Sequence, residues 1–281
     1  MSSLPLEARP SRASGAVAIP RADALARIGR VAVGIAFVAF GAANVVVGDF
    51  VAGRAPPWPS DVPGQFAWAY ATAIVFIVAG VCVMSGRWAM RAAMVVAGLI
   101  ATWALLRQIP LALADQQFGG EWTKLGKALT LSGGLLGVAG SFALASTEAT
   151  DDEIHRAWMM RAAGRLSLGA FLVASGVQHF LFAPFVATLV PAWIPGAMFW
   201  TYFAGTALIA GGLGLVLAET SRLAATLVGL MVLTWLFVLH IPRGLAMNNQ
   251  NEWTAVIEAL AVSGIALSLV QRARVAWAGT Q

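Results

Sequence analysis

Long apolar stretches alternate with short polar ones along most of the chain. Runs such as VAVGIAFVAFGAANVVVG, AWAYATAIVFIVAGVCVMSG and MFWTYFAGTALIAGGLGLVLA contain no acidic or basic residue. Each approaches the roughly 20 residues that an α-helix needs to cross a ~30 Å hydrocarbon layer. Glycines, prolines and charged residues separate the runs. The pattern predicts an all-α, polytopic membrane protein.

The pattern predicts eight transmembrane helices. We expect them at about residues 28–49, 65–86, 90–110, 123–146, 162–184, 198–218, 222–241 and 252–271. Because eight is an even number, both termini would lie on one side of the membrane. Residues 1–26 are polar and rich in arginine and proline, and we expect them to form a mobile basic tail.

Composition agrees with a membrane protein. Hydrophobic residues make up 59% of the chain and charged residues 11%, whereas soluble domains carry roughly 25% charged residues. The sequence pI is about 10.3, but the basic residues do not form one dense run, so no nucleic-acid partner is expected. Cys82 is the single cysteine, which excludes an internal disulfide or a two-thiol redox couple.

The basic residues are distributed unequally between the two sides. Five of the 18 lysines and arginines fall opposite the termini, and all the others lie on the side of the termini: the five are Arg54, Arg107, Lys124, Lys127 and Arg243. Cytoplasmic loops carry such an excess of positive charge. The sequence therefore predicts cytoplasmic termini and, as the location, the bacterial cytoplasmic membrane.

The chain repeats itself. Gly29, Arg30, Gly34, Gly41 and Phe50 align with Gly164, Arg165, Gly169, Gly176 and Phe185, and the tripeptide EWT occurs at 121 and again at 252. Further matches pair Trp58 with Trp193, Trp68 with Trp200, Tyr70 with Tyr202, and Trp103 with Trp235. Repeats on this scale are the signature of a duplicated architecture.

The repeat defines the expected domains. A first four-helix unit at 27–147 and a second at 162–281 are joined by an acidic cytoplasmic linker at 148–161. Since each unit has an even number of spans, the two would be parallel and related by a pseudo-two-fold axis along the membrane normal. The expected fold is thus two parallel, pseudo-symmetric four-helix bundles.

Three aligned positions differ in charge between the halves. Asn44 aligns with His179, Gln108 with His240, and Lys127 with Glu258. Helical rise places the three second-half residues in one layer near the outer surface. Ionisable residues at such a depth usually face a bundle interior or a wet cavity. His179, His240 and Glu258 are therefore the candidate catalytic residues, and the second half is the candidate functional half.

Two alternatives remain open for these residues. Lys127 and Glu258 would form a buried ion pair if the fourth and eighth helices meet at the pseudo-symmetry axis. His240 would be an interfacial histidine if it bonds a backbone carbonyl left unpaired by Pro242. Trp193, Trp200, Tyr202 and Arg243 are candidates for substrate binding at the rim. No metal site is expected, because the sequence contains no HExxH or ExxH spacing.

Each half resembles a DoxX-like four-helix membrane domain. The resemblance is carried by GRLSLGAFLVASGVQHFLFAPF, VPAWIPGAMFWTYFAGTALIAGGLGLVL and SRLAATLVGLMVLTWLFVLHIPR, and it covers about residues 162–270. The first half fits more loosely, since it lacks the histidines. The resemblance implies His179 and His240 as positions of interest and a link to quinone-dependent redox chemistry.

Three functions follow as hypotheses. The first is a redox-associated membrane component that acts on a quinone or another apolar substrate, with a soluble redox partner or another membrane protein supplying electrons. The second is a non-catalytic scaffold or assembly factor. The third is a carrier for a small or lipidic solute. Whether the chain is an enzyme stays open at this point, and a quinone is the one cofactor considered.

Overall fold

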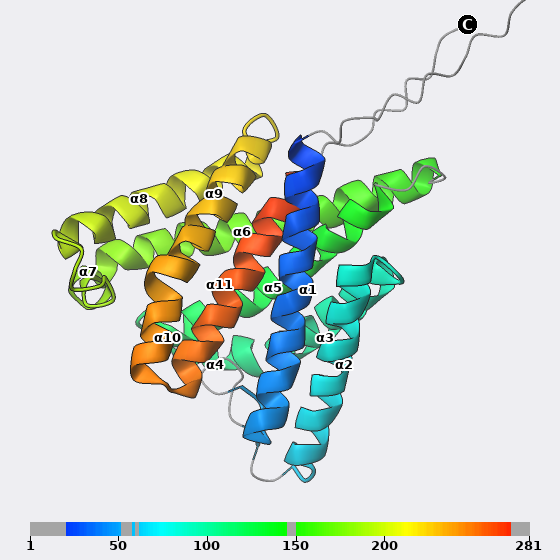
Figure 1. Ribbon diagram of the computed structural model, residues 1–281, viewed down its shortest axis with the longest axis horizontal. Coiled ribbons are helices and arrows are strands. Elements are labelled where there is room, and N and C mark those ends of the chain that lie inside the picture. The colour runs from blue at the N-terminus through cyan, green and yellow to red at the C-terminus, as the bar shows by residue number, and fades with distance from the viewer. Residues whose placement is uncertain (1–20, 52–57, 60–61, 145–149, 271–281) are drawn as a thin grey trace, which may run out of the picture.

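The computed structural model describes residues 21–51, 58–59, 62–144 and 150–270, and within these ranges it is helical, with no strand (Figure 1). The all-α prediction is confirmed. The elements are α1 (Arg21–Val47), α2 (Gln65–Ser85), α3 (Ala89–Trp103), η1 (Ala104–Gln108), α4 (Ile109–Ala114), α5 (Gly120–Ala143), α6 (Asp151–Leu181), α7 (Ala183–Ala187), α8 (Ala197–Val216), α9 (Ser221–Trp235), η2 (Leu236–His240), α10 (Ile241–Met247) and α11 (Gln250–Ser268).

Among the described residues, five helices are long and apolar enough to cross a membrane. They are Ala24–Val47, Gln65–Ser85, Ala89–Ala114, Ala197–Val216 and Ser221–Met247. The chain is thus an integral membrane protein by helix length and composition. Eight spans and two bundles stay predictions, and α5, α6 and α11 are the expected spans outside this set.

Two boundaries differ from those expected. α1 begins at Arg21, inside the segment assigned to the basic tail, whose residues 1–20 lie outside the described ranges. α6 begins at Asp151, so most of the expected linker 148–161 is helical. The reason is a capping box, in which the Thr150 hydroxyl accepts a hydrogen bond from the Glu153 backbone N–H and the Glu153 carboxylate accepts one from the Thr150 N–H.

The two halves share their local irregularities. A left-handed glycine, Gly64 (φ 89°) or Gly196 (φ 76°), precedes α2 and α8. The π-helical turns η1 and η2 each end just before an Ile-Pro pair, at Pro110 and Pro242. Proline cannot donate an N–H and its ring crowds the preceding turn, which explains why the helix widens there.

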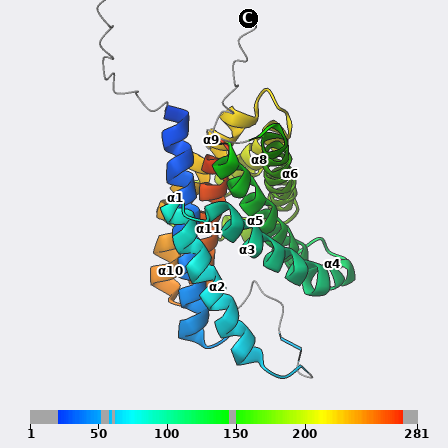
Figure 2. The same ribbon diagram turned by 90° about the vertical axis from the view of Figure 1, so that its right-hand side faces the viewer.

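Helix packing crosses the boundary between the halves. α1 packs along α2 and α11, and α6 packs along α8 and α5 (Figures 1 and 2). Gly29 lies against Gly264 of α11, and its counterpart Gly164 lies against Gly133 of α5. The first helix of each half therefore contacts the last helix of the other half through small residues that let the backbones approach closely.

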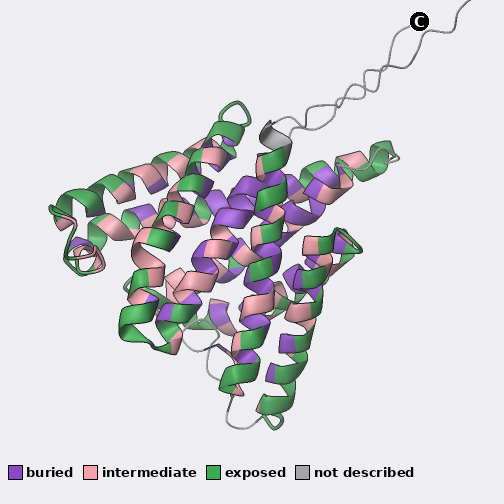
Figure 3. Cartoon of the chain, viewed as in Figure 1, coloured by how far each residue is buried: buried purple, intermediate pink, exposed green. Residues whose placement is uncertain are grey.

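The last helices of the two halves also contact each other at the centre. α5 packs on α11, where Gly134 faces the Ile265 side chain. Buried residues concentrate on these two helices (Figure 3). Each of the two also bonds the third helix of its own half, since the Ser132 hydroxyl donates to the Ala97 carbonyl and the Ser263 hydroxyl to the Gly229 carbonyl.

Candidate functional site

A cavity of about 500 Å³ lies inside the first half. α1, α2, α3, η1 and α5 form its wall, and Glu258 of α11 reaches it from the second half. This volume falls within the range typical of small-molecule sites. α1 packs on α11 and α5 packs on α6, and the cavity lies between α1 and α5.

Seven aromatic side chains line the cavity. They are Phe37, Phe40, Phe50, Trp58, Trp68, Phe76 and Trp103. Three of them stack on one another: Phe50 on Trp58 with ring centroids 5.6 Å apart, Phe50 on Trp103 at 5.5 Å, and Trp58 on Trp103 at 5.8 Å. The ring planes lie within 21° of parallel. Such a surface suits a flat apolar ring.

Hydrogen bonds fix the segment that follows α1 against this wall. The Asn44 amide oxygen accepts from the Val51 backbone N–H at 3.1 Å, and the Trp58 indole N–H donates to the Val62 carbonyl. Asn44 is buried and itself lines the cavity. The residue that aligns with His179 therefore has a structural role in the first half.

Lys127 and Glu258 form an ion pair in the cavity wall. The Lys127 ammonium donates to the Glu258 carboxylate across 2.8 Å, and the two side chains are 25% and 7% exposed. The pair joins α5 to α11. Of the two alternatives for Glu258, the structure contains the ion pair, and a buried pair of this kind is strongly destabilised when one partner is removed.

His240 belongs to the second π-helical turn. It ends η2, which packs against α11, the helix that carries Glu258 and Glu252. Its counterpart Gln108 ends η1 and lines the cavity. The halves differ at the aligned pairs Gln108/His240 and Lys127/Glu258. Both pairs lie on α5, α11 or the π-helical turns that pack against these helices. π-helical turns often occur at functional sites.

His179 lies on a different part of the fold. Its Nδ1 is 2.7 Å from the Ser175 carbonyl of its own helix α6, and its β-carbon is close to Gly205 of α8. Within the part of the chain that the structure describes, His179 does not belong to the cavity wall. The structure packs η2, which ends at His240, against α11, which carries Glu258, whereas His179 lies on α6 beside α8.

The aromatic rim residues of the second half lie on the surface. Trp193, Trp200 and Tyr202 are 71%, 43% and 43% exposed. Trp200 donates its indole N–H to the Pro195 carbonyl, and Tyr202 stacks on Phe180. The described cavity wall includes none of the three.

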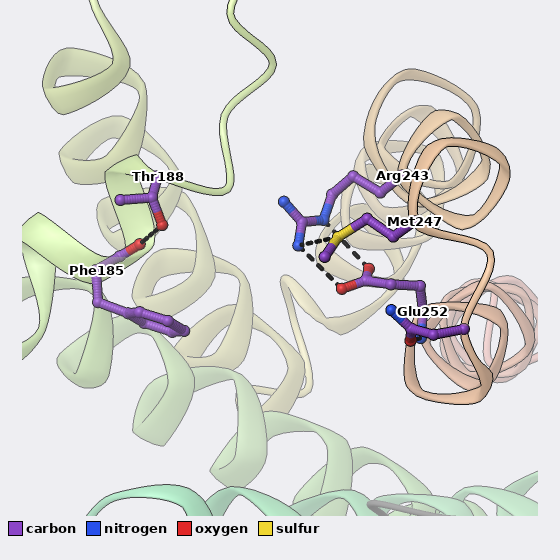
Figure 4. Close-up of polar contacts among 6 residues, drawn as sticks. Phe185, Thr188, Arg243, Met247 and Glu252 are labelled. Atoms are coloured by element: carbon purple, nitrogen blue, oxygen red, sulfur yellow. Dashed lines mark hydrogen bonds and ion pairs between the residues drawn. The ribbon is translucent and has the colours of Figure 1, made fainter.

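Arg243 belongs to an ion pair that joins α10 to α11. Its guanidinium donates to both oxygens of Glu252, at 2.9 and 3.2 Å, and also lies 3.6 Å from the Met247 sulfur (Figure 4). The bidentate geometry holds the turn between the two helices. Arg243 is thus engaged with the protein itself at this position.

Sequence reasoning missed the aromatic wall of the first half. Phe50, Trp58 and Trp103 match aromatic residues at aligned positions of the second half. The pattern therefore indicates a structural role common to both halves. A comparison of charge between aligned positions cannot detect them, because these positions are uncharged in both halves. A count of aromatic residues near Lys127 in the expected bundle would have been the useful signal.

The comparisons with known proteins concern mainly the second half. A family model described as "Domain of unknown function (DUF8561)" matches residues 168–280. No curated protein and no solved structure matches the chain. Within the described residues, no group of three or more histidine, cysteine, aspartate or glutamate side chains is placed to hold a metal ion.

Proposed function

We propose that this chain is a DoxX-like membrane protein that binds an apolar ring molecule, with a quinone as the leading candidate, in the aromatic cavity of its first half. One observation carries the proposal: an aromatic cavity of about 500 Å³ has a charged pair, Lys127 and Glu258, in its wall. Flat rings stack on aromatic residues, and the Lys127 ammonium of the pair can donate a hydrogen bond to a ring oxygen.

The proposed chemistry is redox-associated. Reduction of a quinone to a quinol takes up two electrons and two protons, and a soluble redox partner or another membrane protein would supply the electrons. Lys127 would donate a hydrogen bond to a ring oxygen as negative charge grows on that oxygen. The Glu258 carboxylate would take up a proton from water and pass it to the reduced ring, once for each of the two protons. His240, at the end of the turn that packs against α11, would be the second proton-carrying group.

The proposed membrane arrangement extends the five candidate spans to eight. α5, α6 and α11 would complete two parallel four-helix units with both termini in the cytoplasm of a bacterial cell. Their polar residues are compatible with this arrangement, because other helices cover α5 and α11 on many sides. The Lys127–Glu258 pair would then be in the outer third of the membrane.

Photoaffinity labelling tests the proposed binding. The full chain in lipid nanodiscs is irradiated with an azido-naphthoquinone, and labelled peptides are mapped by mass spectrometry. We expect labelling of the peptides that contain Phe50, Trp58 or Trp103, and loss of that labelling in Trp58→Ala. Trp193→Ala, the matched variant in the second half, should label normally.

The scaffold hypothesis has the opposite outcome in this experiment. A scaffold needs no ligand in the cavity, so labelling would spread over lipid-facing helices and would not respond to Trp58→Ala. That result would reject quinone binding in favour of a non-catalytic role.

A further inference from the structure

The indole N–H of Trp103 is a buried hydrogen-bond donor for which no described residue supplies an acceptor. The ring that carries it lines the cavity and stacks on Phe50 and Trp58. Buried polar groups in proteins are nearly always paired, so each exception calls for an explanation. A ligand that fills the cavity beside this ring is one such explanation.

Four other tryptophans have acceptors. The indole N–H groups of Trp58, Trp122 and Trp200 donate to backbone carbonyls, and that of Trp253 donates to the Asn248 side chain. Trp103 differs from these four, because its indole N–H is buried and has no acceptor among the described residues.

We propose that Trp103 is a ligand-binding residue whose indole N–H donates a hydrogen bond to an uncharged acceptor oxygen of the molecule in the cavity. This inference rests on the proposed binding of a ring molecule there and identifies the ligand class more closely. The ligand is a flat ring with a carbonyl or ether oxygen. A hydrocarbon of the same shape leaves the N–H unpaired and binds more weakly.

The position of Trp103 gives this contact a second consequence. Trp103 ends α3, directly before the π-helical turn η1 that carries Gln108 into the same cavity. Lys127 also lines that cavity. A ring with two oxygens, as in a quinone, can meet the indole N–H with one oxygen and the Lys127 ammonium with the other.

The test compares two probes that differ in their oxygens. Binding of 2-methyl-1,4-naphthoquinone and of 2-methylnaphthalene is measured by equilibrium dialysis against the full chain in nanodiscs, with empty nanodiscs as the blank. The readout is the ratio of the two affinities, because loss of packing affects both probes alike. The variants are Trp103→Phe and, at position 103, the analogue β-(3-benzothienyl)alanine, which keeps the bicyclic ring and replaces the N–H by sulfur.

We expect the wild type to prefer the quinone and both variants to lower the ratio about fivefold, the effect of one neutral hydrogen bond. Trp235→Phe, the matched change in the second half, should leave the ratio unchanged. An unchanged ratio in the benzothienyl variant would overturn the inference and assign the N–H to water. If the wild type binds the quinone no better than the hydrocarbon, the cavity binds rings but Trp103 does not recognise their oxygens, and the inference fails. If neither probe binds, the proposed function fails as well.

Discussion

Lys127 and Glu258 occupy equivalent positions in the two halves and face each other across 2.8 Å. A duplication that kept both residues identical would have set two like charges against each other at this contact. Opposite charges instead stabilise the junction of α5 and α11, and the same pair provides the charged groups of the cavity. The contact between the halves and the candidate site are therefore one feature.

Exchange of the two charges should be tolerated, whereas removal of one should not. Glu258→Gln leaves the Lys127 ammonium without its carboxylate, and we expect a loss near the lower end of about 3–5 kcal/mol, since Lys127 is partly exposed. The double variant Lys127→Glu with Glu258→Lys should recover most of it. Thermal unfolding in detergent measures all three proteins. A double variant no more stable than Glu258→Gln would contradict a simple ion pair.

The crossing of α1 and α11 should be sensitive to a single methyl group. A β-carbon at Gly29 would lie 2.5 Å from the Ser268 nitrogen and 2.6 Å from the Gly264 oxygen. We expect Gly29→Ala to cost about 1–3 kcal/mol through overpacking. Gly98→Ala is the control, because no atom lies within 4 Å of its β-carbon and alanine favours the helix. Equal unfolding temperatures for the two variants would argue against close packing at Gly29.

The helices and the repeat were predictable because each depends on short stretches of the sequence. Hydrophobic runs mark the helices, and aligned glycines such as Gly29 and Gly164 do make equivalent contacts. Which helices pack together was not predictable in this way. An apolar face suits any apolar neighbour, so nothing in the pattern shows that α1 meets α11 and leaves a cavity beside Trp103.

The first turn of α6 should loosen in acid. Hydrogen bonds from the backbone N–H and the hydroxyl of Thr150 lower the pKa of the Glu153 carboxyl. A lowered pKa means that the stabilisation is complete above the pKa of the unfolded chain and is lost as the pH falls through the folded value. Hydrogen exchange of peptides covering 150–160, corrected for intrinsic rates, should show more opening at low pH. Glu153→Gln should remove this pH dependence, and its persistence in that variant would assign it to another group.

Filling the cavity should abolish ligand binding without unfolding the protein. Thr72 lines the cavity from α2, so the larger side chain of Thr72→Trp enters space that a ligand would otherwise occupy. We expect loss of azido-naphthoquinone labelling with an unfolding temperature close to that of the wild type. Ala204→Trp places the same side chain at the equivalent position of α8, outside the cavity wall, and should keep the labelling per folded molecule. Labelling that survives Thr72→Trp would mean that the quinone binds at another place, because a tryptophan and a naphthoquinone ring cannot occupy the same part of a 500 Å³ cavity.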